Sequence, residues 1–373
     1  MKTINIGVIG WGFMGKTHTQ ALTNIPILYS GLDFQICLRC VCARHAENAR
    51  AAAAAVGFER WTDDYRQLLA MEDIDVVSVC TPNDQHEEMA VAAIRAGKHV
   101  YIDKPLAVDG ESADRIARAA AEADVLTGMA FNNRGFPSTI RAKQLVEEGR
   151  IGDVLTFQAR YLHAGSIDPN KPIGWKLQRQ GGVLLDLGSH ALDLITWLAG
   201  YPARVFCSMY TLYDRRPTAD GGEERALSED HVQALLQMEN GAIGSVEASK
   251  IATGANDELT LELRGTKGAL LWNSMDASYL YYYDQTLPDA VCGGTKGFTR
   301  IECVQRYPAP GGKLQAKNAV GWDRGHTHSY FMFLDAVNRG VRPEVGVAEG
   351  ARLQRLMDDM KRSHETGRWV DVR

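Results

Sequence analysis

The segment that decides the fold is "INIGVIGWGFMG", residues 4–15. Its first six residues are rich in isoleucine and valine and predict a short buried strand. Gly10, Gly12 and Gly15 follow in the pattern G-x-G-x-x-G, where a helix is expected to begin. Gly10 permits a tight turn, Gly12 lets the backbone approach a pyrophosphate, and Gly15 lets the helix lie close to the strand. The helix N-terminus would add amide donors and partial positive charge for the phosphates. Alone, the motif also fits an ordinary glycine-rich turn.

The segments that follow alternate between strand-like and helix-like patterns. They are "FQICLRCVCA" (34–43), "HAENARAAAAAVG" (45–57), "DVVSVCTP" (75–82), "HEEMAVAAIRAG" (86–97) and "HVYID" (99–103). Apolar strands that alternate with helices predict an α/β domain with a doubly wound parallel sheet. In this context the glycine motif predicts a Rossmann domain over residues 1–128 that binds a dinucleotide.

The end of the second strand bears on the choice between NAD and NADP. NAD enzymes often carry an acid there that binds the 2′-hydroxyl of the adenosine ribose. This chain has Ala43, followed by Arg44. Arg44 could pair with a 2′-phosphate or stack on adenine. Alternatively, Arg44 is solvated and NAD binds through its remaining contacts. The predicted cofactor is therefore NAD or NADP.

Composition limits the class of protein. The 373 residues suggest two domains, and 45% hydrophobic with 23% charged residues is typical of a globular protein. A net charge of −5 without a lysine or arginine run argues against nucleic acid and anionic membranes as partners. No apolar run approaches the roughly 20 residues of a membrane span, and the first strand begins too early to leave room for a signal peptide. These features predict a cytoplasmic protein.

The seven cysteines, an odd number, fit free thiols in a reducing compartment. Cys37, Cys40 and Cys42 form C-x-x-C-x-C, but no second pair follows at zinc-ligand spacing. Buried thiols on a strand are favoured, and no metal is expected.

A second informative segment is "GGVLLDLGSHALDLITWL", residues 181–198. It has the pattern of a buried helix, yet it contains Asp186, His190 and Asp193. At about 100° per residue, His190 lies about 40° from Asp186, and Asp193 lies about 20° to the other side of Asp186. A hydrogen-bonded pair on a helix is the common reason for such spacing. A catalytic pair is the alternative.

The segment "TPNDQHEEMAVAAIRAGKHVYIDKPLA", residues 81–107, resembles the glucose–fructose oxidoreductase/inositol dehydrogenase family, Gfo/Idh/MocA. That family shows TPN-x-x-H, AGKHV and E-K-P-L-A. This chain differs at Asp103, where glutamate is usual. The family's G-G-x-x-x-x-D-x-x-x-H resembles the segment from Gly181 to His190, although three residues instead of four separate Gly182 from Asp186, and Val183 stands in place of a common third glycine.

The resemblance implies an α+β domain with a large, mostly antiparallel open sheet over residues 129–373, which binds substrate and mediates homodimers or homotetramers. Independently of the resemblance, seven strand-like segments support such a sheet, and their order suggests a meander. They are "DVLTFQARYLH", "ARVFCSMYTLYD", "DHVQALLQME", "AIGSVEASKI", "ELTLELRG", "GALLWN" and "SYLYYYD". Helices are expected over residues 326–339 and 347–366.

The activity that the resemblance implies is NAD(P)-dependent hydride transfer with a secondary hydroxyl of a sugar, sugar derivative or inositol-like polyol. Such a reaction needs a group that takes the hydroxyl proton. The implied catalytic residues are Lys104, which would hold the hydroxyl oxygen, His190 as base, and Asp186, which would orient the imidazole or bind substrate. The Lys104-Pro105 bond is expected to be cis. Asp193 is expected to orient a neighbour.

The implied cofactor-binding residues are Gly10, Trp11, Gly12, Phe13, Met14, Gly15, Arg44, Thr81, Pro82, Asn83, His86, Asp103 and Lys104. The alternative activity is a redox-neutral, NAD-dependent glycosidase that forms a keto-sugar intermediate. A non-catalytic cofactor-binding regulator is disfavoured because Lys104 is present.

Substrate contacts are expected from His163, Trp175, Lys176 and His326. A tryptophan followed by a basic residue at positions 175–176 resembles pyranose-oxidising members of the family, and Trp175 could form a platform for a sugar ring. Simple packing of Trp175 in its loop competes equally. For His326, at the start of a helix, a capping or oligomer role competes with substrate contact.

Overall fold

The computed structural model describes residues 1–178, 181–312 and 314–373. Contacts divide these residues into two compact units. The first unit comprises residues 1–135, 306–317 and 321–354, and the second comprises residues 136–305, 318–320 and 355–373. Each unit has its own large sheet. A domain boundary at residues 128–129 stays a prediction.

The first unit contains a six-stranded parallel sheet in the order β3-β2-β1-β4-β5-β6. The strands are β1 (Lys2–Ile9), β2 (Phe34–Cys42), β3 (Arg60–Thr62), β4 (Val76–Val79), β5 (His99–Ile102) and β6 (Thr127–Met129). The helices are α1 (Phe13–Leu28), α2 (Ala46–Val56), α3 (Tyr65–Leu69), α4 (His86–Arg95), α5 (Gly110–Ala121) and α8 (Trp322–Arg339). The predicted doubly wound parallel sheet is confirmed.

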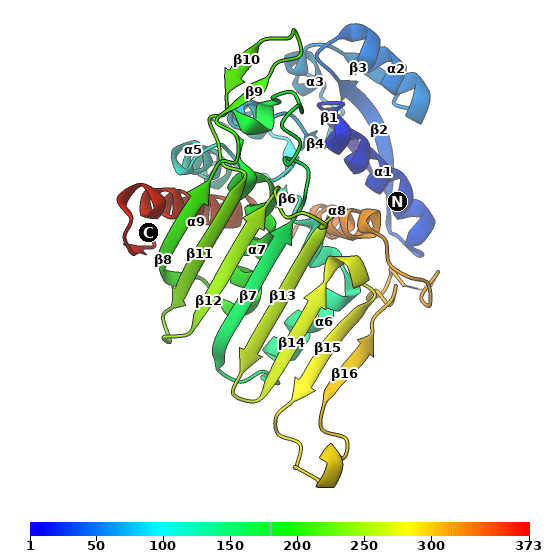
Figure 1. Ribbon diagram of the computed structural model, residues 1–373. Coiled ribbons are helices and arrows are strands. Elements are labelled where there is room, and N and C mark those ends of the chain that lie inside the picture. The colour runs from blue at the N-terminus through cyan, green and yellow to red at the C-terminus, as the bar shows by residue number, and fades with distance from the viewer. Residues whose placement is uncertain (179–180, 313) are drawn as a thin grey trace. The chain divides into compact units, whose positions relative to one another are not determined.

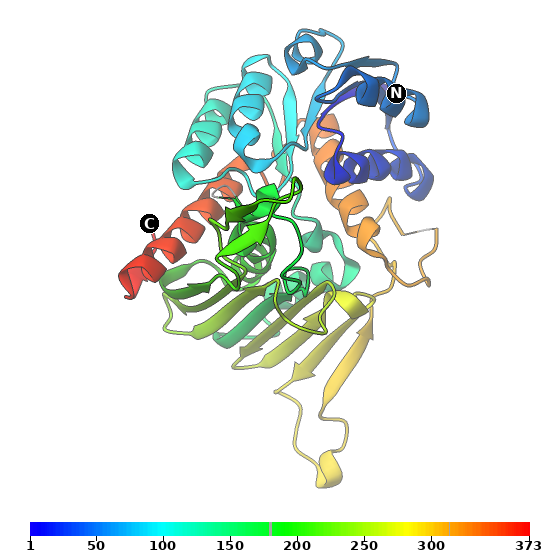
Figure 2. The ribbon, with the colours of Figure 1, turned by 45° about the horizontal axis from the view of Figure 1, so that its top comes forward.

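Apolar strand residues explain the core of this unit. Ile4, Ile6 and Val8 of β1 are fully buried, as expected for a parallel sheet covered on both faces. α8 packs beside α1, although some 300 residues of chain separate their first turns (Figure 2). Tyr330 of α8 stacks on Tyr101 of β5 with ring centroids 4.1 Å apart. A helix from the last quarter of the chain therefore completes the Rossmann core.

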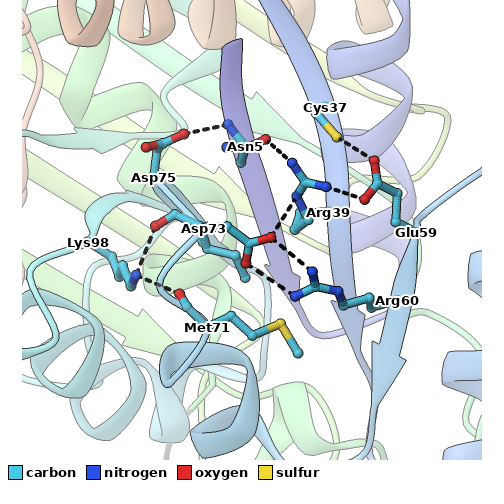
Figure 3. A network of polar contacts seen from close by, with 10 residues as sticks. Asn5, Cys37, Arg39, Glu59, Arg60, Met71, Asp73, Asp75 and Lys98 are labelled. Carbon is cyan, nitrogen blue, oxygen red and sulfur yellow. Dashed lines mark hydrogen bonds and ion pairs between the residues drawn. The ribbon is translucent and has the colours of Figure 1, made fainter.

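A polar network joins the first three strands to the segment that leads into β4 (Figure 3). The Asp73 carboxylate binds Arg39, with Nε 3.3 Å away, and Arg60, with Nη2 3.0 Å away. The Lys98 ammonium is buried and donates hydrogen bonds to the carbonyl oxygens of Met71 (2.8 Å) and Ile74 (2.9 Å). These contacts fix the segment at the amino end of β4, which is the sheet edge opposite to the glycine loop.

The second unit contains a nine-stranded sheet in the order β16-β15-β14-β13-β7-β12-β11-β8-β17. The strands are β7 (Val154–Leu162), β8 (Pro202–Tyr210), β11 (His231–Met238), β12 (Ile243–Ser249), β13 (Glu258–Gly265), β14 (Gly268–Asn273), β15 (Tyr279–Asp284), β16 (Phe298–Glu302) and β17 (Val370–Asp371). A separate hairpin pairs β9 (Arg215–Pro217) with β10 (Glu223–Arg225).

The sheet is mostly antiparallel, as predicted, but it is not a simple meander. β7 lies between β12 and β13 and runs parallel to β12. The chain therefore crosses β7 when it passes from β12 to β13. A parallel neighbour requires a long connection, and residues 163–201, which include α7 (Ser189–Ala199), supply part of it.

Helices cover one face of this sheet. Phe157, Ala159 and Tyr161 of β7 are buried and alternate with more exposed residues. α7 contacts β7, β12 and β13, and α6 (Pro137–Glu147) contacts β14 and β15 on the same face (Figure 1). α9 (Val347–Thr366) belongs to the first unit up to residue 354 and to the second unit beyond it.

The helix predicted over residues 181–198 differs from a regular α-helix at its start. Leu184–Gly188 form a π-helical turn, in which the Ser189 amide donates to the Leu184 carbonyl oxygen. The predicted angle between the Asp186 and His190 side chains assumed 100° per residue, as in a regular α-helix. That assumption is wrong here, because residues in a π-helical turn are spaced by a smaller angle.

Among the helices of the described ranges, none has both the length and the apolar character that crossing a membrane requires.

Candidate active site

A cavity of about 820 Å³ opens at the carboxyl ends of β1, β2 and β4 in the first unit. Open α/β sheets bind their ligands at this edge. Six of the predicted cofactor residues line the cavity. They are Gly10, Trp11, Gly12, Arg44, Thr81 and Pro82.

The glycine loop has the geometry that the motif requires. Gly10 has φ of +100°, and a Cβ there would lie 2.6 Å from the Cys80 carbonyl oxygen. A Cβ at Gly15 would lie 1.9 Å from the Gly10 carbonyl oxygen, so the helix lies directly on the loop. At Gly12 a Cβ would meet no protein atom within 4 Å. Gly12 therefore faces the open side of the loop, where it also caps the 16-residue helix α1.

These features fit a dinucleotide. The first-turn amides of a helix lack intrahelical acceptors and suit a pyrophosphate. Ala51, Ala52 and Ala55 of α2 line the cavity with small side chains. The sequence-based prediction missed several lining residues, because their pattern marks only a helix face or a strand end. They are Lys16, Asn48, Asp63, Tyr65, Gln85 and Met89.

The other predicted cofactor residues are not among those that line the cavity. Phe13 is 71% exposed and stacks on Trp322, with ring centroids 5.8 Å apart. The buried His86 imidazole lies with one nitrogen 2.9 Å from the Thr81 carbonyl oxygen and the other 2.9 Å from the Pro105 carbonyl oxygen. His86 thereby joins the two loops that follow β4 and β5. Roles in cofactor binding stay predictions for Phe13, His86, Met14, Gly15, Asn83, Asp103 and Lys104.

Lys104 follows the end of β5, at the same sheet edge as the glycine loop. Its backbone amide donates a hydrogen bond of 2.9 Å to Oδ1 of Asp103, which is buried. The Lys104-Pro105 peptide bond is cis, as the family resemblance implies.

His326 belongs to the same unit as Lys104. It is buried on α8, with its ring centroid 4.4 Å from Trp322 and 6.3 Å from His18. Burial lowers the pKa of His326 well below its usual value, and the nearby charges of His18 and Lys104 lower it further. The imidazole is therefore neutral at pH 7 and within electrostatic reach of Lys104. Direct substrate contact by His326 stays a prediction.

In the second unit, Asp186 lies between two ammonium groups. Lys176 Nζ is 2.9 Å from both carboxylate oxygens, and Lys250 Nζ is 2.8 Å from Oδ2. The Lys250 and Asp186 side chains are 15% and 16% exposed, whereas that of Lys176 is 47% exposed. Lys250 directly follows β12, and the sequence-based prediction missed it because a single lysine at a strand end carries no signal.

His190 lies near Tyr161 at the carboxyl end of β7, with ring centroids 5.7 Å apart. The Tyr161 hydroxyl donates to Oδ1 of Asp257 (2.6 Å), and His163 Nε2 is 2.8 Å from the same oxygen. Burial, and then the Asp257 charge, raise the pKa of Tyr161, so its hydroxyl remains a donor. Tyr161 and Asp257 were also missed, since only the fold brings Tyr161 near His190 and Asp257 against Tyr161.

Trp175 is 47% exposed, and the Lys176 ammonium lies 5.7 Å from its ring centroid. Lys176 therefore contacts both an accessible aromatic ring and the Asp186 carboxylate. Asp193 is buried one turn beyond His190. In the second unit, the structure thus brings Asp186 and Lys176 into direct contact, with Trp175 alongside.

Two family models match the chain. The oxidoreductase family model with an NAD-binding Rossmann fold matches residues 4–131, and the GFO/IDH/MocA C-terminal domain model matches residues 139–271. Levoglucosan dehydrogenase of Pseudarthrobacter phenanthrenivorans is 32% identical over 100% of this chain and 99% of that protein. Inositol 2-dehydrogenase of Rhizobium meliloti is 29% identical over 72% of this chain and 75% of that protein.

Solved structures agree over the full length. Levoglucosan dehydrogenase in complex with NADH and levoglucosan is 31% identical with a TM-score of 0.93, and the same enzyme with NADH and L-sorbose is 30% identical with a TM-score of 0.94. Each alignment covers 100% of both chains.

Proposed function

Because this chain belongs to the Gfo/Idh/MocA family of NAD-binding oxidoreductases, we propose that it oxidises a secondary hydroxyl of a sugar, with a pyranose as the preferred substrate. The observation that carries the proposal is the full-length likeness to a dehydrogenase solved with NADH and levoglucosan. The cavity lined by Gly10, Gly12 and Thr81 supports it, since its geometry suits a dinucleotide. Inositol-like polyols are the second substrate class, because inositol dehydrogenases are also similar.

The reaction breaks one C–H and one O–H bond of the substrate and forms a carbonyl group. Bound NAD would accept the hydride at its nicotinamide ring. In our proposal, Lys104 holds the hydroxyl oxygen and stabilises negative charge that develops on it. His190 takes the hydroxyl proton as general base. Lys104 follows strand β5, and His190 lies in the first turn of helix α7. Regular elements of this kind can hold catalytic groups in a precise geometry.

Asp186 has the supporting role in this proposal. Two ammonium groups contact its carboxylate, so it is held as a charged acceptor at the start of the catalytic helix. From there it orients His190 or accepts a substrate hydroxyl. Lys176 and the exposed face of Trp175 lie beside it and would contact the sugar, and His163 would reach it from the end of β7.

We also propose that the chain assembles into a homodimer or homotetramer through the face of the large sheet that carries no helix. Leu235 and Ile243 are 41% and 47% exposed and share one face, because Leu235 pairs with Ser245, two residues along β12 from Ile243. Exposed apolar residues on one sheet face favour a protein interface. For location we propose the cytoplasm, since none of the seven cysteines is in a disulfide.

The experiment that tests the function is a panel of pyranoses, inositols and glycosides assayed with NAD for absorbance of NADH. We expect stoichiometric NADH formation with at least one pyranose. Cleavage of a glycoside without net NADH would support the glycosidase alternative and contradict the proposal. K104M and H190A should each lower kcat by about 10²- to 10⁴-fold and leave NADH affinity within about threefold, since general acid–base groups contribute about 10²–10⁴. Full activity of H190A would remove the base assignment.

A further inference from the structure

The position where many NAD enzymes carry an acid is Ala43, and it is buried. The structure shows an acid on the neighbouring strand instead. β2 and β3 are parallel with Cys42 beside Thr62, and the Ala43 amide donates to the Thr62 carbonyl oxygen (3.2 Å). The next residue of that strand end is Asp63. Paired strands lie about 4.8 Å apart, so Ala43 and Asp63 are neighbours along the carboxyl edge of the sheet.

Asp63 and Arg44 both line the 820 Å³ cavity, and both are exposed. Within the part of the chain that the structure describes, neither side chain has a hydrogen-bond or ion-pair partner. Asp64, the next residue, differs in both respects. Its carboxylate caps α3 by accepting from the Arg66 amide (2.9 Å), and it does not line the cavity. Asp64 therefore stabilises the start of α3, whereas Asp63 faces the cavity and can bind a ligand.

The surroundings of Asp63 suit an adenosine group. Ala51 and Ala55 line the same cavity, together with Asn48 and Tyr65. Small and aromatic side chains with a few polar groups are typical of a nucleotide pocket.

We propose that Asp63 performs the function of the missing acid at residue 43 and makes the protein select NAD over NADP. Its carboxylate would accept hydrogen bonds from the ribose hydroxyls of adenosine. The 2′-phosphate of NADP would bring a doubly negative group to the same place, and like charges disfavour it. This inference rests on the dinucleotide binding assumed in the proposed function, and it does not depend on the identity of the sugar.

Arg44 acts in the opposite direction. Its guanidinium attracts a 2′-phosphate and can equally stack on the adenine ring. The Arg44 side chain is long and exposed, so its charge is loosely positioned. Asp63 has only two side-chain torsions and directly follows a strand, so its carboxylate is held more firmly. The carboxylate therefore decides which of NAD and NADP binds more tightly. Arg44 limits the size of this preference. The expected result is a preference for NAD of about 10- to 100-fold, rather than complete exclusion of NADP.

The test measures NADH and NADPH affinity by fluorescence titration without any sugar. The wild type should bind NADH at least tenfold more tightly than NADPH. D63N should reduce this ratio at least tenfold, mainly by tighter NADPH binding, and R44M should increase it by weakening NADPH binding. D64N removes the neighbouring negative charge and keeps the cap of α3, because asparagine caps a helix as well as aspartate does, and it should leave the ratio within twofold. D63S also removes the carboxylate at this exposed position and should reduce the affinity ratio as D63N does.

A wild type that prefers NADPH, or D63N and D63S variants with an unchanged ratio, would overturn the proposal. Loss of the preference in D64N to the same extent would also overturn it, since the effect would then belong to the loop and not to the Asp63 charge. If the sugar panel gives no NADH while the affinity ratios change as expected, only the proposed substrate is wrong.

Discussion

Substitution of Gly15 and Gly12 by alanine should affect stability differently, although the two residues are only three positions apart. At Gly15 a Cβ would lie 1.9 Å from the Gly10 carbonyl oxygen, a backbone atom that cannot rotate away. At Gly12 a Cβ meets no protein atom within 4 Å, and φ of −79° is accessible to alanine. G15A should therefore damage the fold, and G12A should damage only dinucleotide binding.

The magnitudes follow from the geometry. An alanine inside a helix is ordinarily more stable than glycine by about 1 kcal/mol, so G15A would stabilise α1 if space allowed. The close contact requires a shift of about 1 Å between helix and loop, and overpacking costs about 1–3 kcal/mol. Since 1 kcal/mol shifts Tm by about 2–4 °C in a unit of this size, G15A should lower Tm by several degrees.

For G12A, the loss of an N-cap glycine should cost less than about 1 kcal/mol of stability. Its methyl group would instead displace the pyrophosphate from the loop amides. Hydrogen bonds to charged groups contribute about 1.5–3 kcal/mol each, so NADH affinity should fall about 10- to 100-fold.

The assay combines thermal unfolding by circular dichroism with fluorescence titration of NADH. G15A should show a lower Tm together with weak NADH binding, and G12A should show nearly wild-type Tm with weak binding. A G15A protein with wild-type Tm and affinity would refute the close approach of helix and loop. Unchanged NADH affinity in G12A would refute the position of the pyrophosphate.

Three other changes test separate parts of the structure. K250M should reduce the free energy of unfolding by about 1–3 kcal/mol, because it removes a well-buried partner of Asp186. K176M removes a more exposed partner and should reduce the free energy of unfolding by about 0.2–1 kcal/mol. Chemical denaturation measures both losses, and equal values would contradict this order. Burial, with the charge of Arg324, lowers the pKa of His328 to about 3 in the folded state. Unfolded chains then bind the extra proton below about pH 6.5, so stability should fall as pH drops from 6.5 towards 3, by up to about 1.4 kcal/mol per pH unit, and H328Q should flatten the slope of Tm against pH. K98M should lower Tm without changing the affinity for NADH, because two charge-assisted hydrogen bonds worth about 3–6 kcal/mol in total are lost at the sheet edge opposite to the cavity.

The first unit could be predicted well because its signals are local. The apolar strands, the glycine loop and the helix that Gly57 ends with φ of +86° are all visible within short windows of sequence. The three-residue strands β3 and β6 were missed, since a short strand has no period to detect. Asp63 was missed for the same reason, as it follows β3.

The second unit was predicted less completely because its order depends on distant pairings. Nothing in the sequence of β7 shows that it lies parallel to β12, about 90 residues later. The contact of Lys250 with Asp186 depends on that pairing, because β12 carries the lysine to the helix start. The π-helical turn at Leu184–Gly188 likewise breaks the regular spacing on which the sequence-based comparison of Asp186 with His190 depended.

The stacking of Tyr330 on Tyr101 has a consequence for synthesis on the ribosome. The nascent first unit has its six strands long before residues 322–339 leave the exit tunnel, and until then the side of β5 that carries Tyr101 lacks its cover. The emerging chain must therefore pass through a partly folded intermediate with exposed aromatic surface, which is the kind of species that chaperones bind.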